Sequence, residues 1–163
     1  MRKAVFVTAV IPVMVFWACN SQNNPVSETQ KADSTVTKTE NMKNLVSIVE
    51  IPAADLSRSV TFYQAILGIL IEQTEMDGVQ MGVFPSDGEG VSIVLAKGKD
   101  YKPTRDGAVV YLNAGDDLQT VLDKIGPNGG KVLVPKTQIS PEMGFFAMFT
   151  DTEGNKLGLH SMH

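Results

Sequence analysis

The sequence predicts the α+β fold class, with two paired βαβββ modules at about residues 43–99 and 105–163. Two observations support this prediction. The sequence repeats itself when it is shifted by 62 to 65 places, so that Met81, for example, falls on Phe146. In both copies, one run with helical spacing follows the first strand-like run, and three more strand-like runs come after it. The small drift in the shift is what loops of unequal length produce.

The first copy begins with a β-rich run over residues 45–51, which Pro52 ends. Asp55 or Ser57 can cap the helix that follows, and Gly68 stands just past its end. The apolar residues of this helix recur at helical spacing: Val60, Tyr63, Ile66 and Leu67. Three short runs bounded by Gly-containing turns then predict strands, at residues 69–75, 79–84 and 91–96.

The second copy has the same order of signals. Residues 108–113 predict a strand, and residues 117–125 predict a helix, with Gly-rich residues 126–130 closing it. The apolar stripe of this helix consists of Leu118, Val121, Leu122 and Ile125. Three further strands are predicted, at residues 131–138, 144–150 and 156–161.

The N-terminal segment predicts export and lipid attachment. An apolar run follows Arg2 and Lys3 and is shorter than the roughly 17 to 25 residues that a membrane-spanning helix needs, so we interpret residues 1–18 as a signal peptide. The string from Phe16 to Cys19 resembles the lipobox of bacterial lipoproteins, which implies a lipid on Cys19. We therefore expect a lipoprotein anchored in the bacterial cell envelope, facing the periplasm or the exterior. Plain secretion and an uncleaved anchor are the alternatives.

Residues 19–42 predict a disordered tether, because they are polar, contain no aromatic residue and cannot bury enough apolar surface to fold. A flexible chain of this length reaches on the order of 25 to 30 Å. Cys19 is the only cysteine, so the domain can form no internal disulfide. The net charge is −4 and the basic residues are scattered, which argues against a nucleic acid partner.

Three stretches in the order of the chain resemble the vicinal oxygen chelate superfamily, which includes glyoxalases, bleomycin-resistance proteins and extradiol dioxygenases. They are residues 55–63, residues 66–68 and residues 149–155. A Glu-Ile-Pro string at residues 50–52 and a Gly-Leu-His string at residues 158–160 add to the resemblance. It implies that two modules pair so that their sheets form a cup for a small-molecule ligand, either within a monomer or across a homodimer.

The resemblance also implies where a metal would be held, since metal enzymes of this superfamily take ligands from the first and last strands of each module. The matching positions here are Ile48, Val94, Val110 and Gly158. These side chains carry no donor atom, so the standard four-ligand site is absent and no cofactor is predicted.

Two residues further along the same strands stand Glu50, Ala96, Leu112 and His160, which we expect on one face because strand side chains alternate. Glu50 and His160 are the candidate catalytic residues, since a carboxylate beside an imidazole can form an acid–base pair. The same two residues could instead hold a divalent metal weakly. Glu50 could also face solvent, and His160 lies close to the C-terminus, where chain ends fray.

Met81, Phe146 and Met148 are the candidate ligand-binding residues, because the same alternation turns them into the cup and makes it partly apolar. Two functions follow from this site. The first is a module that binds a small molecule without a metal, and the second is a lyase or isomerase that uses Glu50 and His160. A structural envelope lipoprotein without a small ligand is a third possibility.

Overall fold

The computed structural model describes residues 44–163, which contain two α-helices and eight β-strands. The predicted signal peptide at residues 1–18, the lipidation site Cys19 and the predicted tether at residues 19–42 all lie outside the described residues. Neither helix of the described part is long and apolar enough to cross a membrane.

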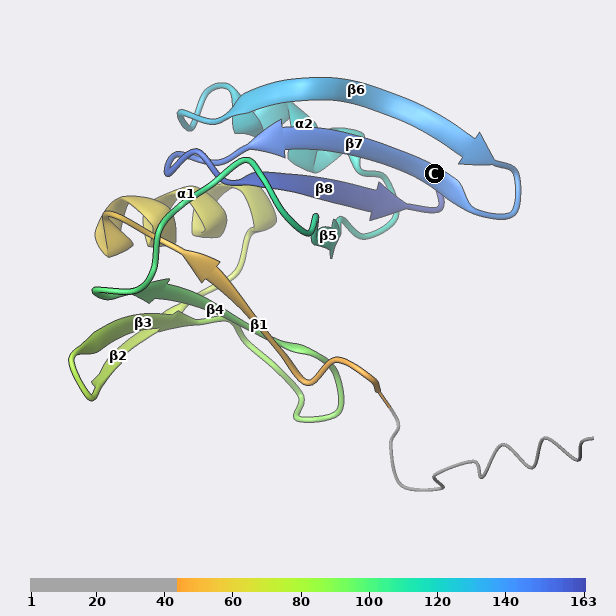
Figure 1. Cartoon of the computed structure of the whole chain (residues 1–163). Coiled ribbons are helices and arrows are strands. Elements are labelled where there is room, and N and C mark those ends of the chain that lie inside the picture. The colour runs from red at the N-terminus through yellow and green to blue at the C-terminus, as the bar shows by residue number, and fades with distance from the viewer. Residues whose placement is uncertain (1–43) are drawn as a thin grey trace, which may run out of the picture. The chain divides into compact units, whose positions relative to one another are not determined.

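The first module has the predicted βαβββ order, shown in Figure 1. Strand β1 pairs in parallel with β4, and the other pairs are antiparallel, which gives the sheet order β1-β4-β3-β2. We call this sheet 1. Its elements are β1 (Ile48–Pro52), α1 (Leu56–Leu67), β2 (Glu72–Met76), β3 (Val79–Val83) and β4 (Ser92–Lys97).

The second module repeats this order and forms sheet 2, with the strand order β5-β8-β7-β6. Here too the first strand pairs in parallel with the last one. The elements are β5 (Tyr111–Asn113), α2 (Gln119–Ile125), β6 (Lys131–Ser140), β7 (Gly144–Thr150) and β8 (Lys156–Ser161). The predicted fold class of two βαβββ modules is therefore confirmed.

Helix α1 begins and ends where the sequence predicts. Asp55 is the N-cap, and its carboxylate accepts a hydrogen bond of 3.1 Å from the amide of Arg58. Gly68 ends the helix with φ of 69°, a left-handed conformation that glycine adopts without steric cost. Helix α2 begins later than predicted, at Gln119, although the carboxylate of Asp117 still accepts a hydrogen bond from the Gln119 amide.

Several strand boundaries differ from the prediction. Strand β1 starts at Ile48 and includes Pro52, which an edge strand tolerates. Strand β5 starts at Tyr111, three residues later than predicted, and β2 starts at Glu72 in place of residue 69. Strand β6 runs on to Ser140 through three irregularities of its register.

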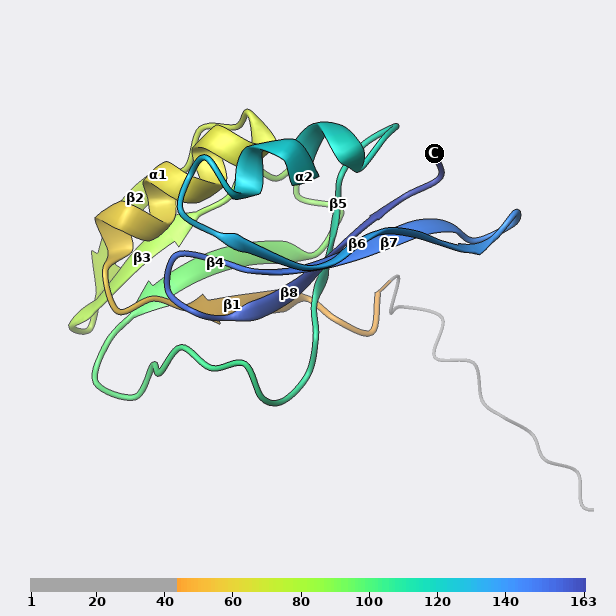
Figure 2. The ribbon, with the colours of Figure 1, turned by 90° about the horizontal axis from the view of Figure 1, so that it is seen from above.

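Both sheets turn their helix-covered faces to one shared core. Phe62 of α1 lies with its ring centroid 6.2 Å from that of Phe149 of β7, so the two modules meet in the middle of this core. Figure 1 shows α1 between the two sheets, and Figure 2 shows α1 and α2 side by side, with β1 and β8 on the other side of the domain. The face of each sheet opposite its helix, which we call the outward face, points away from the shared core.

Ser59 of α1 is fully buried, and its Oγ has no hydrogen-bond partner among the described residues. Replacing it with Ala should remove the cost of burying an unpaired hydroxyl, so we expect the free energy of unfolding to rise by about 1 kcal/mol. Urea unfolding of the full chain measures this change. Ser57→Ala, at an exposed position of the same helix, is the matched control for helix propensity, and an equal gain in both variants would contradict the burial argument.

Candidate functional site

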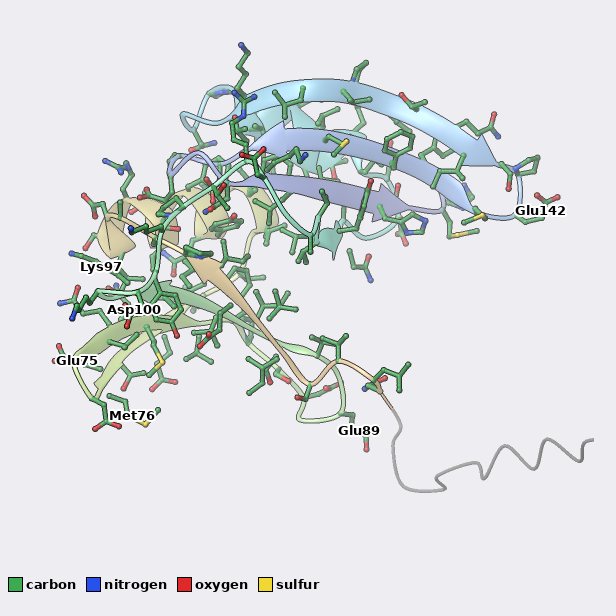
Figure 3. The ribbon with its side chains drawn as sticks, in the orientation of Figure 1. Glu75, Met76, Glu89, Lys97, Asp100 and Glu142 are labelled. Carbon is green, nitrogen blue, oxygen red and sulfur yellow. The ribbon has the colours of Figure 1, made fainter. Side chains whose placement is uncertain are left out.

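The outward face of sheet 1 carries two of the predicted site residues. Glu50 lies opposite Val94, and Met81 lies opposite Ala96, so all four side chains share this face with Ile48. Ile48 is 61% exposed and Met76, at the end of β2, is 62% exposed. Figure 3 shows Met76 projecting from the side of sheet 1 that lies away from α1. The strands of this face thus present mainly aliphatic and methionine side chains.

The outward face of sheet 2 differs from the prediction at its first strand. We expected Val110 and Leu112 on this face, but Leu112 is only 3% exposed and Val110 packs against the core. Tyr111 and Asn113 take the outward positions, opposite Gly158 and His160 of β8. The difference arises because β5 pairs with β8 one residue out of the expected register, and such a shift moves every side chain of a strand to the other face.

Tyr111 lies directly over Gly158. A Cβ atom added to Gly158 would come within 2.2 Å of Tyr111 Cδ1 and within 2.4 Å of Cε1, so only glycine fits beneath the ring. The ring of Phe146 on β7, which is separated from β5 by β8, stands edge-on to Tyr111, with 6.4 Å between the centroids. Met148 lies opposite Gly158 and Phe146 lies opposite His160, so both predicted ligand-binding residues of sheet 2 are on this face.

Glu50 lies beside the segment between β4 and β5, residues 98–110, which we call the linker. Its Oε2 accepts a hydrogen bond of 2.9 Å from the hydroxyl of Tyr101, and this bond raises the pKa of Tyr101. Glu50 also lines a pocket of about 90 Å³ between β1, the linker and the start of β8. The linker is held at this place by Thr104, whose amide donates to Asn155 Oδ1 and whose carbonyl accepts from the Lys156 amide.

His160 binds a different partner. Its Nε2 lies 2.7 Å from the carbonyl oxygen of Met143, which can only accept, so Nε2 carries the proton and Nδ1 of the neutral ring is left as an acceptor. Within the described residues, no hydrogen bond joins Glu50 to His160, and the two lie on the outward faces of different sheets. Each side chain thus has its own hydrogen-bond partner, and their action as an acid–base pair stays a prediction.

The comparisons with known proteins agree with this fold. The sequence model of the Glyoxalase/Bleomycin resistance protein/Dioxygenase superfamily matches residues 45–159. The chain belongs to this superfamily. A glyoxylase-like domain-containing protein of Didymella fabae is 30% identical over 113 residues, which are 68% of this chain and 88% of that protein.

Solved structures of the glyoxalase superfamily share the fold. A glyoxalase I variant from Zea mays matches with a TM-score of 0.59 and 19% identity over 71% of this chain, which spans only 45% of the maize chain. TnmS3 from Streptomyces sp. CB03234, an antibiotic binding protein, matches with a TM-score of 0.57 and 23% identity, over 72% of this chain and 95% of TnmS3.

The residues of this superfamily member do not fit the metal site that the fold implies. Ile48 and Val94 offer only hydrocarbon on sheet 1, and at Gly158 on sheet 2 the Tyr111 ring leaves no room for a carboxylate side chain. Within residues 44–163, no three side chains of His, Cys, Asp or Glu come together as a possible metal site.

Glu153 joins the two modules, a role that the sequence did not indicate. It lies in the β7–β8 turn, and its side chain has no exposed surface. It accepts hydrogen bonds from the amides of Ala54 and Asp55, at 2.9 and 2.8 Å, and from Nε of Arg58 at 2.8 Å. Burial alone would raise the pKa of Glu153, but these hydrogen bonds outweigh it and the pKa is lowered.

Because its folded-state pKa is lowered, Glu153 stabilises the domain above its ordinary pKa of 4.5, and this contribution is lost as the pH falls through the folded-state value. We expect Glu153→Gln to lower the free energy of unfolding at pH 7 by about 1 to 2 kcal/mol. In urea unfolding of the full chain, the difference from wild type should shrink as the pH falls. Glu75→Gln, at an exposed position, is the control, and a pH-independent difference for Glu153→Gln would contradict the assignment.

Proposed function

We propose that this protein is an exported, lipid-anchored binding protein, which holds a small molecule on the outward faces of its sheets and needs no metal ion to do so. The observation that carries the proposal is the Tyr111 ring over Gly158, where the superfamily's metal enzymes hold a ligand. The predicted signal peptide and lipid on Cys19 would place the domain at the bacterial cell envelope. TnmS3, which shares this fold, is an antibiotic binding protein, which supports the binding of a small molecule as a role for the fold.

The cup would be completed by a second copy of the chain. Both outward faces leave apolar side chains in water, including Ile48 on sheet 1 and Tyr111 on sheet 2, which is 47% exposed. A two-fold axis that lays sheet 1 of one protomer against sheet 2 of its partner would cover both faces in both protomers. Each cup would then contain Glu50 of one protomer and His160 of the other.

A lyase or isomerase is the second candidate. It is favoured by one observation, that Nδ1 of His160 is left as a proton acceptor while Nε2 is bonded to Met143. In the dimer, His160 could take a proton from a bound substrate and Glu50 could stabilise the charged ring. The same pair could hold a divalent metal weakly, with water or substrate completing its coordination.

Cross-linking tests the shared cup. Full chain carrying Cys19→Ser and Glu50→Cys is mixed with full chain carrying Cys19→Ser and His160→Cys and treated with a short bis-maleimide. We expect a cross-linked dimer from the mixture, and none when Asp87→Cys, in the exposed β3–β4 loop, replaces His160→Cys. Equal cross-linking in both mixtures would contradict a cup formed from two chains.

Analysis of the purified full chain separates the two functions. We expect native mass spectrometry to find a bound small molecule, and elemental analysis to find less than one divalent metal per chain. One metal per chain that disappears in His160→Ala would overturn the metal-free proposal. Conversion of the co-purified molecule by wild type, but not by Glu50→Ala or His160→Ala, would favour the enzyme.

Incorporation of a labelled fatty acid tests the anchor. In a bacterial host, wild-type chain should carry the label and Cys19→Ser should not. A labelled Cys19→Ser chain, or an unlabelled wild type, would contradict the lipid anchor.

A further inference from the structure

The two outward faces differ in chemistry. The strands of sheet 1 contribute aliphatic and methionine side chains, and the one aromatic ring near them, Tyr101, comes from the linker and donates its hydroxyl to Glu50. The strands of sheet 2 contribute two aromatic rings, Tyr111 and Phe146, beside His160. A ligand that lies between such faces meets aromatic surface on one side only.

We propose that the ligand is a neutral, planar aromatic carboxamide, whose ring lies against Tyr111 and Phe146 and whose amide faces Asn113 and His160. This inference depends on the proposed binding function and specifies its ligand class.

The geometry of Tyr111 supports the aromatic ring of the proposed ligand. One side of its ring is packed on the backbone of Gly158, and 47% of the residue remains exposed. Phe146 meets this ring at an interplanar angle of 64°, so the two form a corner in which a flat ring contacts one face and one edge. Aromatic pairs in such arrangements gain about 0.5 to 1.5 kcal/mol beyond the burial of their area.

The hydrogen bonds that Asn113 and His160 already make support the amide group of the proposed ligand. Asn113 Oδ1 accepts from the Gly115 amide, and no hydrogen bond of the side-chain NH₂ is found within residues 44–163, so this NH₂ is available as a donor. His160 Nδ1 is available as an acceptor. The two residues lie opposite each other on β5 and β8, so the face offers a donor and an acceptor side by side. A carboxamide presents the complementary pair.

The charge of the site excludes an anionic ligand. Tyr111, Asn113 and His160 line one depression, together with Asp116, and no Lys or Arg lines it. The carboxylate of Asp116 would repel a ligand carboxylate, and no Lys or Arg lines the depression to offset this repulsion. We therefore expect an amide to bind and the corresponding acid not to bind.

Matched probes test the inference. Ligand-observed NMR titrations of the full chain would use benzamide, the saturated analogue cyclohexanecarboxamide and the anion benzoate. We expect benzamide to bind at least about fivefold more tightly than either of the others, which corresponds to about 1 kcal/mol. Tyr111→Leu should remove this preference, since it keeps apolar surface and loses the ring. His160→Ala should weaken the binding of benzamide, and Leu70→Ala, at an exposed position before β2, is the control and should leave this binding unchanged.

The outcomes separate this inference from the proposed function. Equal binding of benzamide and its saturated analogue, tight binding of benzoate, or an unchanged preference for benzamide in Tyr111→Leu would overturn the ligand class. The binding function would stand in those cases, because a small molecule is still bound. If neither the probes nor any co-purified molecule binds the full chain, both the inference and the proposed function are wrong.

Discussion

Replacing Asp151 with Ala is expected to lower the free energy of unfolding by about 3 to 5 kcal/mol, because it leaves buried donors without their acceptor. Asp151 is 4% exposed and lies in the β7–β8 turn. Its Oδ2 accepts from the hydroxyl of Tyr63 and from Asn155 Nδ2, both at 2.9 Å, and its Oδ1 accepts from the amides of Glu153 and Asn155. Burial raises the pKa of Asp151 despite these bonds.

The contact with Tyr63 is the part of this network that links the two modules, since Tyr63 belongs to α1 and is fully buried. A double-mutant cycle with Tyr63→Phe isolates it. We expect Tyr63→Phe to cost about 1 to 2 kcal/mol in wild type and little in the Asp151→Ala background. Asp151→Asn extends the series if Asp151→Ala does not fold.

Urea unfolding of the full chain, followed by circular dichroism, measures these free energies. Asp106→Ala, at an exposed linker position, is the matched control and should change stability by less than about 0.5 kcal/mol. A cost below about 1 kcal/mol for Asp151→Ala would show that the buried carboxylate does not hold the turn in place.

Replacing Gly158 with Ala is expected to destabilise the domain by about 1 to 3 kcal/mol, because the new Cβ would overlap the Tyr111 ring and force it off the sheet. Gly158→Glu, which introduces a larger side chain with a carboxylate, should cost at least as much. In a Tyr111→Ala background, the added cost of either substitution should fall sharply, since the obstructing ring is gone.

Thermal and urea unfolding of the full chain would measure this rescue. Gly90→Ala is the matched control, because a Cβ at Gly90 meets no atom within 4 Å and the backbone there does not need glycine. A Gly158→Ala variant as stable as Gly90→Ala, or one that Tyr111→Ala does not rescue, would contradict the packing of Tyr111 on Gly158.

The order of helices and strands could be predicted from the sequence because local residue patterns in each module indicate it. Asp55 and Gly68 mark the ends of α1, and the alternating runs that became β3, β4, β7 and β8 are bounded by turn residues. The two copies also support each other, since each strand has a counterpart in the other module.

The face of β5 could not be predicted in the same way. The shift of 62 residues that aligned the first strands puts Leu112 where Glu50 stands, but the ladders align Glu50 with Tyr111, because Glu50 pairs with Val94 and Tyr111 with Gly158. Tyr111 and Leu112 are both apolar enough to be buried, so hydropathy does not choose between the two registers.

The contacts between the modules could not be predicted from the sequence either. Asp151 and Glu153 belong to a stretch that indicated the family and a turn, but their partners Tyr63 and Arg58 lie 88 and 95 residues away. Nothing in the local pattern of either segment specifies the other. Sequence reasoning could place Glu50 and His160 on strands of different modules, but it could not identify their separate hydrogen-bond partners, Tyr101 and Met143.

The division of each strand between a core face and an outward face separates the residues that maintain the fold from those that select a ligand. In β8, Leu157 and Leu159 serve the interior, whereas Gly158 and His160 do not belong to it. Substitutions at His160 can therefore accumulate during evolution with little penalty in foldability, whereas Gly158 can change only together with Tyr111, whose ring covers it. A lineage of such proteins could give up metal chemistry and acquire new specificities while it kept the same scaffold.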